Sequence, residues 1–327
     1  MTLLAMKHAL ILATLLVLVL VPASAHAAFP GANGPIAYVS SRGGPPVPMV
    51  FDPGDAAPRA VGRAGEVGPA WSPDGAALAV AGAVLTAGRG PTIFEIVTMR
   101  ADGADAMPIT TDRGQDYDPT WSADGRRIAY SRMVGGNRDI WVVDASGGVP
   151  ERLTRAPADD SLPSWSPDGS QIAFTRTRAN DGEIYVMNTD GSALHNITKR
   201  HGDDEDPDWA PDGTRIAYTR YGEGATADVW TMTATGADPR PLVRHRANDT
   251  QAAWSPDGTH VAFTSNRKGH DDIWTVAATG GRAIDLTPDP ATDDSPAWGV
   301  RSAVGDLGAV PGLRPAASPS QRPGPSL

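Results

Sequence analysis

The chain has 327 residues, of which 40% are hydrophobic and 20% charged, and its formal net charge is −10 at pH 7. This negative balance argues against a partner with a phosphate backbone, so nucleic acid is excluded as the expected ligand. The sequence contains no cysteine, which excludes disulfide bonds, thiolate metal sites and a cysteine nucleophile. With 36 glycines and 30 prolines, the composition favours many short strands joined by tight turns.

Residues 1–27 have the pattern of a secretory signal peptide. A basic residue precedes an apolar run over residues 9–21, and Ala25-His26-Ala27 has the small-x-small form of a cleavage site. Cleavage before Ala28 is favoured, and Ala23-Ser24-Ala25 is the competing site. Because the apolar run is short for a bilayer, we expect no stable membrane insertion after cleavage and a periplasmic or secreted location.

A short phrase, Trp-Ser-Pro-Asp-Gly with small variations, divides the rest of the chain into repeats. Five complete copies and one truncated copy begin at Trp71, Trp121, Trp165, Trp209, Trp254 and Trp298. The steps between these tryptophans are 50, 44, 44, 45 and 44 residues. This period predicts the blades of a β-propeller, each with about four strands. We expect the six indoles to fill the spaces between blades.

Within a repeat, the apolar residues alternate with period two. In the second repeat the expected strands are residues 119–121, 128–131, 139–143 and 152–154. Their β-branched and aromatic residues favour strands over helices. Asp-Gly pairs between them supply a side chain that bonds its own backbone and a residue that accepts positive φ, so they are expected to form turns.

The two ends of the array predict how the ring closes. In each repeat the tryptophan strand is followed by a second strand of the Ile-Ala-Phe type. The earliest such second strand, Ile36-Ala37-Tyr38, has no tryptophan strand before it, and Trp298 has no second strand after it. We therefore expect Trp298 to pair with Ile36, and residues 49–51 and 59–61 to complete a sixth blade. Phe29 is the competing candidate for the place of Trp298. Closure would remove exposed sheet edges.

The predicted fold is thus all-β: a six-bladed β-propeller of four-stranded antiparallel blades over residues 28–300, closed by a C-terminal strand that joins three N-terminal strands. Residues 301–327 are rich in Pro, Ser and Ala. They offer few apolar side chains that could stabilise an ordered structure, so we expect a disordered tail.

The order Trp-Ser-Pro-Asp-Gly, Ile-Ala-Phe, Asp-Ile-Trp-Val and Leu-Thr resembles the TolB-type propeller repeat. The resemblance extends through every blade, from about residue 29 to residue 299. It implies a propeller fold, a cell-envelope location and a channel face that receives partner segments. TolB carries an α/β domain ahead of its propeller, and we expect that domain to be absent here because only some 30 residues precede the first strand.

An acidic residue stands five positions before each of the six tryptophans. These six residues, called the rim acids, are Glu66, Asp116, Asp160, Asp204, Asp249 and Asp293. Each leads into the innermost strand of a blade, so all six should lie at one end of the central channel. A ring of carboxylates concentrates negative potential, which predicts binding of cations or a basic peptide, with Ca²⁺ as a candidate ion.

A structural interpretation of the rim acids competes with the binding one and is favoured at this stage. An aspartate before Pro-x-Trp can bond neighbouring backbone amides and fix its loop. Arginines recur after the second strand, at Arg132, Arg176 and Arg220, and they could neutralise the acids in pairs. Further acids occur in the same loops: Asp118, Asp159, Asp203, Glu205, Asp206 and Asp294.

The sequence predicts no catalytic residues. It contains no Gly-x-Ser-x-Gly motif, and its histidines share neither a repeat position nor a metal-ligand spacing. The functional prediction is a monomeric module without a required cofactor, which binds an envelope protein or a basic peptide through the acidic rim. The alternative is a metal-dependent hydrolase or lyase that acts on a glycan at the channel.

Overall fold

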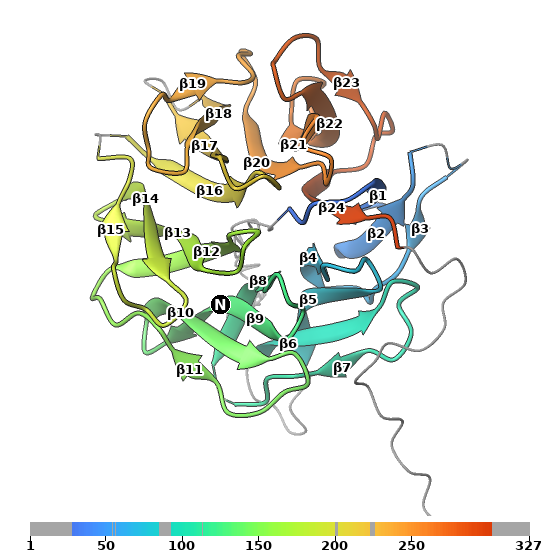
Figure 1. Ribbon diagram of the computed structural model, residues 1–327. Helices are drawn as coiled ribbons and strands as arrows, with labels where there is room; N and C mark the ends of the chain where they lie inside the picture. Colours follow the sequence, from blue (N-terminus) through green and yellow to red (C-terminus); the bar gives the residue numbers. More distant parts are fainter. Residues whose placement is uncertain are drawn as a thin grey trace, which may run out of the picture.

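The computed structural model describes residues 28–302 except 54, 56, 85–92, 113, 200–201 and 223–225. The predicted signal peptide and nearly all of the predicted tail lie outside the described residues. Every regular element of the described chain is a β-strand, and the strands form six four-stranded antiparallel sheets. Figure 1 shows the six sheets arranged in a ring, which confirms the predicted propeller. No helix of the described residues is long and apolar enough to cross a membrane.

Blades are numbered here in chain order. Blade 1 contains β4 (Val67–Trp71), β5 (Ala77–Val84), β6 (Ile93–Arg100) and β7 (Met107–Pro108). Blade 2 contains β8 (Gln115–Trp121), β9 (Arg127–Val134), β10 (Asn137–Asp144) and β11 (Glu151–Arg152). Blade 3 contains β12 (Asp159–Trp165), β13 (Gln171–Arg178), β14 (Asp181–Asn188) and β15 (His195–Asn196). Blade 4 contains β16 (Asp204–Trp209), β17 (Arg215–Tyr221), β18 (Ala227–Thr233) and β19 (Arg240–Pro241). Blade 5 contains β20 (Asp249–Trp254), β21 (His260–Ser265), β22 (Asp272–Ala277) and β23 (Ile284–Asp285).

Blade 6 joins the two ends of the chain, as predicted. Its strand order is β24 (Asp293–Val300), β1 (Asn33–Ser40), β2 (Val47–Phe51) and β3 (Arg59–Ala60). Ile36 is the register partner of Trp298, so Trp298 takes the inner position and Phe29 lies outside the strands. The red β24 beside the blue β1 marks this seam in Figure 1. The ring therefore closes with strands from opposite ends of the sequence.

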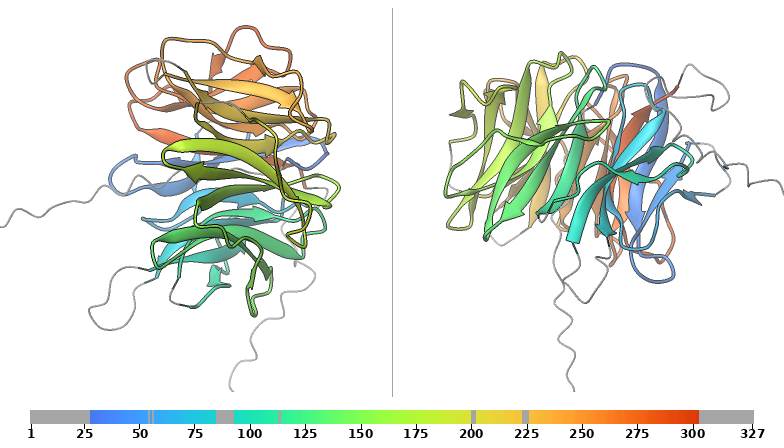
Figure 2. Two further views of the ribbon diagram at one scale, coloured as in Figure 1. Left: turned by 90° about the vertical axis from the view of Figure 1, so that its left-hand side faces the viewer. Right: turned by 90° about the horizontal axis from the view of Figure 1, so that it is seen from below.

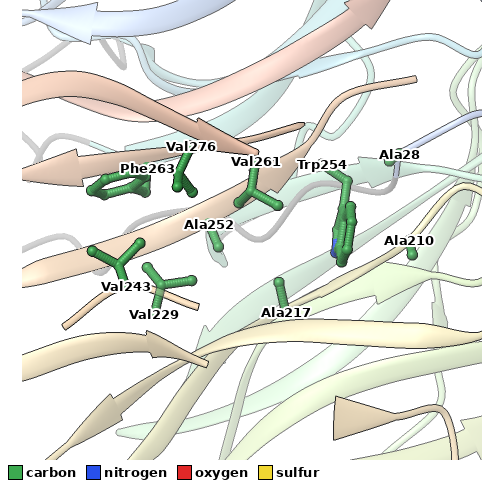
Figure 3. Packing of buried hydrophobic residues seen from close by; sticks show 10 residues of the cluster. All are labelled: Ala28, Ala210, Ala217, Val229, Val243, Ala252, Trp254, Val261, Phe263 and Val276. Atoms are coloured by element: carbon green, nitrogen blue, oxygen red, sulfur yellow. The ribbon is translucent and has the colours of Figure 1, made fainter. Parts of the chain in front are cut away.

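The hydrophobic core is divided among the spaces between neighbouring blades. Figure 3 shows one such space, where Val229 of blade 4 packs with Trp254 and Phe263 of blade 5. The inner-strand tryptophans of all six blades are buried, as predicted. Figure 2 shows the same ring of blades from two sides. Each blade thus depends on both neighbours for burial of its apolar faces.

The inner strand of every blade carries a β-bulge at one repeated position. Register shifts occur there, for example between Tyr117 and Thr120 in β8. The residue two after the rim acid has positive φ in every blade: Gly68, Asp118, Leu162, Asp206, Gln251 and Ser295. A bulge of this kind re-aims side chains relative to a regular strand. It separates the rim acids from the acidic side chains that follow them.

The turns of the Ser-Pro-Asp-Gly phrase lie at the other end of the inner strands, here called the turn end. Asp168 Oδ1 accepts hydrogen bonds from the Ser166 hydroxyl at 2.6 Å and from the Ser170 amide at 3.0 Å. Gly169 has φ of 72°, which an L-residue rarely adopts. This aspartate therefore fixes its own turn.

Candidate functional site

The six rim acids occupy equivalent places, one at the start of each inner strand and all at the same end of the ring, called the acid end. Their side chains are nevertheless buried, with at most 5% of each residue exposed. A fully buried carboxylate needs a compensating partner, because removing it from water disfavours the charged form. The surrounding residues supply such partners in almost every blade.

In blades 2, 3 and 4 the partner is an arginine directly opposite on the second strand. Its Nε and one terminal nitrogen donate to the two carboxylate oxygens, which is the bidentate geometry that favours Arg–carboxylate pairs. The donor–acceptor distances are 2.6–2.7 Å in the pairs Asp116–Arg132, Asp160–Arg176 and Asp204–Arg220. The pairwise neutralisation considered from the sequence therefore exists in these blades.

Blades 5 and 6 form the same pair by a different route. Here a serine lies opposite the rim acid, and the arginine comes two residues later. Arg267 Nη2 lies 2.8 Å from Asp249 Oδ1. Arg42 lies 3.5 Å from Asp293 and also pairs with Asp289. The closing blade thus has the loosest of these five pairs.

Blade 1 has no arginine at this place. Glu66 precedes β4, and Gly82 lies near it on β5. A Cβ added to Gly82 would lie 3.3 Å from Glu66 Cγ. The glutamate side chain therefore lies against a residue that has no side chain of its own. Its Oε2 accepts a hydrogen bond of 2.7 Å from the Arg63 amide, while burial raises its pKa above the ordinary value. Glu66 therefore caps its own loop.

The arginines of blades 2 to 5 are also stacked between aromatic rings. Arg176 Cζ lies 5.5 Å from the Phe174 ring centroid and 4.7 Å from that of Tyr185. Such cation–π contacts stabilise a guanidinium that is held away from water. The same arrangement places Arg132 by Tyr130 and Trp141, Arg220 by Tyr218 and Trp230, and Arg267 by Phe263 and Trp274. Third-strand aromatics of the repeat therefore cover the ion pairs.

An acidic residue also recurs near the start of the third strand in blades 1 to 5, and its role was not predicted from the sequence. In blade 1 this acid is Glu95, whose carboxylate accepts a 2.6 Å hydrogen bond from the Thr110 hydroxyl. Thr110 also accepts the Ile96 amide at 2.9 Å. The threonine of the Leu-Thr motif thus links third and outer strands. The shared spacing of an acid before Ile-Trp and a later Leu-Thr was the signal that could have revealed this contact.

Four acids stand one or two positions after a rim acid, and none of them forms an ion pair with any described residue. They are called the unpaired carboxylates and comprise Asp118, Glu205, Asp206 and Asp294. Burial raises the pKa of Asp118 and of Asp294 to about 6 in each case. Burial, together with the nearby charge of Asp203, raises the pKa of Glu205 to about 7. Burial and the Glu205 charge hold the pKa of Asp206 well above its ordinary range.

Two of these carboxylates are positioned by hydroxyl groups of the second strands. The Ser131 hydroxyl donates to Asp118 Oδ2 at 2.7 Å, and the Thr219 hydroxyl donates to Asp206 Oδ2 at 3.2 Å. The other oxygen of each, Oδ1, is buried without a hydrogen-bond partner among the described residues. An acceptor held in place but left unsatisfied is suited to an incoming donor or cation.

The same hydroxyls connect one blade with the next. Ser131 accepts the amide of Leu162 in blade 3 at 3.2 Å, and Thr219 accepts the amide of Gln251 in blade 5 at 3.1 Å. The bulge residue of one blade is thus tied to the second strand of the preceding blade. This network fixes the positions of Asp118 and Asp206.

One group of acids in the described part of the chain has spacing compatible with a metal ion. Glu95, Asp112 and Asp116 each offer an oxygen within 4.8 Å of the others. Arg132 already pairs with Asp112 and Asp116, and Thr110 donates to Glu95. The group is therefore built around a guanidinium, and a metal would have to displace it.

Comparisons with known proteins agree with this architecture. A family model described as the TolB beta propeller domain matches residues 92–227 and 206–304. TolB from Acinetobacter baumannii is 19% identical with a TM-score of 0.69, covering 82% of this chain and 67% of that one. Hydrazine synthase of Kuenenia stuttgartiensis is 15% identical with a TM-score of 0.70, covering 82% and 47%. An oligogalacturonate lyase in complex with manganese is 14% identical with a TM-score of 0.56, covering 80% and 77%. A search of curated proteins gives no match.

Proposed function

Because this chain belongs to the TolB β-propeller domain family, we propose that it is an exported binding module that receives a basic protein or peptide segment at the acid end of the ring. The observation that carries the proposal is the set of unpaired carboxylates. Unlike five of the six rim acids, they have no arginine partner among the described residues. Glu205 and Asp294 are only partly buried, so a ligand at this end can reach them, whereas Asp118 and Asp206 are buried.

The perturbed pKa values indicate the kind of ligand that would bind. A carboxyl group whose pKa is raised by burial is stabilised by any cation that comes close, because the cation restores the charged form. Glu205 and Asp206 are neighbours, and the Glu205 charge adds to the cost of ionising Asp206. A lysine or arginine side chain would bind here with release of protons. Ca²⁺ is the inorganic alternative for the same oxygens.

The glycan hydrolase or lyase considered from the sequence has no such support. The structural relative that would favour it is a lyase at 14% identity, a level that concerns the fold alone. The acid triad with metal-like spacing is centred on Arg132. A binding role needs no additional catalytic group.

The decisive experiment compares the double substitution Glu205→Gln/Asp206→Asn with the whole chain in binding a fluorescein-labelled Lys-rich peptide. We expect the substitution to weaken binding by about tenfold or more, and binding by the parent to fall as salt rises. Asp144→Asn, at an exposed strand end of blade 2, serves as the control for loss of a carboxylate and should bind like the parent. Equal affinity of the double variant and the control would refute the proposal.

Two measurements address the remaining parts. Melting temperature with and without millimolar Ca²⁺ tests the ion, since a ligand that binds only the folded state raises it. Sequencing the N-terminus of protein recovered from the periplasmic fraction or the medium tests export, and the expected first residue is Ala28. Recovery of unprocessed chain in the cytoplasm alone would refute export.

A further inference from the structure

The segment that precedes β1 leaves its own blade and runs to the middle of the ring. Figure 1 shows the described chain beginning near the centre, beside the start of β1. This segment, Ala28–Gly31, is buried at its first two residues, of which Ala28 is 2% and Phe29 5% exposed. This apolar segment is therefore buried among the inner strands.

Adjacent residues of the segment pack into core spaces on opposite sides of the ring. Ala28 joins the cluster between blades 4 and 5, near Trp254 and Ala210, as Figure 3 shows. Phe29 joins the cluster between blades 1 and 2, which includes Ala70 and Trp121. In a ring of six blades these two spaces face each other across the axis. The chain between Ala28 and Phe29 must therefore cross the axis.

The next two residues fix the segment at the turn end. Pro30 lines a cavity of about 380 Å³ together with Pro167 and Pro211 of the turns in blades 3 and 4. The Gly31 amide donates to the carbonyl of Pro256, in the turn of blade 5, at 3.1 Å. Turns of blades 3, 4 and 5 thus surround these two residues at the turn end.

Gly31 is required by this path. A Cβ at this position would lie 2.6 Å from Cγ1 of Val300 on the closing strand. That distance is shorter than non-bonded carbons tolerate, so a larger residue would force the Val300 side chain or the segment to shift. The closing strand and the crossing segment therefore lie in close contact.

We propose that Ala28–Gly31 plugs the central channel at the turn end, so that the channel is a cup open only at the acid end. A ligand then enters and leaves by the side of the unpaired carboxylates, and no peptide threads through the ring. The closure is independent of what binds. Only the identity of the open end as the ligand entrance rests on the proposed function.

The plug can be tested without a ligand, because the chain has no cysteine of its own. Ala70→Cys places a single thiol in the cluster of Phe29, and its reaction rate with Ellman's reagent reports access. Adding Phe29→Ser to the whole chain should raise this rate about tenfold or more through easier local opening. Adding Phe29→Leu, which keeps an apolar side chain, should leave it near the parent rate.

The matched control is Ala297→Cys, at the equivalent inner-strand position of blade 6. Ala297 is 1% exposed and belongs to a cluster that contains no residue of the plug. Its reactivity should be the same with and without the Phe29→Ser substitution. An unchanged rate at position 70, or an equal rise at both positions through general loosening of the ring, would overturn the proposal. Either result would leave the peptide-binding experiment untouched, so the two failures are distinguishable.

Discussion

Substitution of Asp160 by asparagine should destabilise the ring strongly, although aspartate and asparagine have nearly the same shape. Arg176 holds both carboxylate oxygens, and the side chains of Arg176 and Asp160 are 6% and 0% exposed. The asparagine of the Asp160→Asn variant would offer one acceptor and present an amide to the guanidinium, which leaves a buried charge without its partner. Loss of one member of such a pair costs about 3–5 kcal/mol. For a domain of this size, that corresponds to a fall of roughly 6–20 °C in melting temperature.

Urea unfolding followed by tryptophan fluorescence measures this cost, with Asp144→Asn as the control for removal of one negative charge. The exposed control should change the free energy of unfolding by less than about 0.5 kcal/mol. The double variant Asp160→Asn/Arg176→Met should recover part of the loss, because it leaves no unpaired charge. If Asp160→Asn unfolded like Asp144→Asn, the rim acids would not be structural, and the distinction drawn between them and the unpaired carboxylates would fail.

Three further outcomes follow from the geometry. Gly299→Ala should destabilise the closing strand by about 1–3 kcal/mol in urea unfolding, because its Cβ would lie 2.8–2.9 Å from carbons of the Trp71 ring, whereas Gly222→Ala meets only an ordinary contact. Trp165→Ala should cost about 3–5 kcal/mol in the same assay, since the indole is fully buried. The pKa of Glu205 is raised to about 7, so the unfolded chain ionises first and stability is lost as pH rises from about 4.5 to 7. Glu205→Gln should therefore be more stable than the parent at pH 8, by up to about 3 kcal/mol, and equal to it near pH 4 in chemical unfolding.

The repeat period was sufficient to predict the ring, the blade boundaries and the seam. Strand pairing is a property of the regular pattern, so Trp298 could be placed beside Ile36 without coordinates. The sequence favoured Trp298 over Phe29, which stayed the competing candidate because it also offers an aromatic ring at a suitable distance along the chain. Only the packing across the axis shows that Phe29 belongs to the space between blades 1 and 2.

The places of the rim acids in the ring were predictable from the sequence, but their ionic partners were not. A count of five residues before each tryptophan locates the rim acids, yet it says nothing of which charges meet in space. Arg267 reaches Asp249 from two residues beyond the place used in blades 2 to 4. In blade 1, Glu66 forms no arginine pair and instead lies against Gly82, which has no side chain. Such compensations depend on tertiary contacts and leave no regular spacing.

The rim acids recur in all six blades, whereas the unpaired carboxylates do not. A residue that recurs in every blade has to satisfy the same packing six times, and the rim acids do so by pairing or capping. The residue that follows each of them has no such duty and differs between blades: Val67, Tyr117, Ser161, Glu205, Thr250 and Asp294. Negative charge at this variable position is confined to Glu205 of blade 4 and Asp294 of blade 6, and the other two unpaired carboxylates, Asp118 and Asp206, are buried one position further along. Recognition of a basic segment should therefore be directional, with its cations set toward those two blades, while the repeated acids keep the frame that holds them.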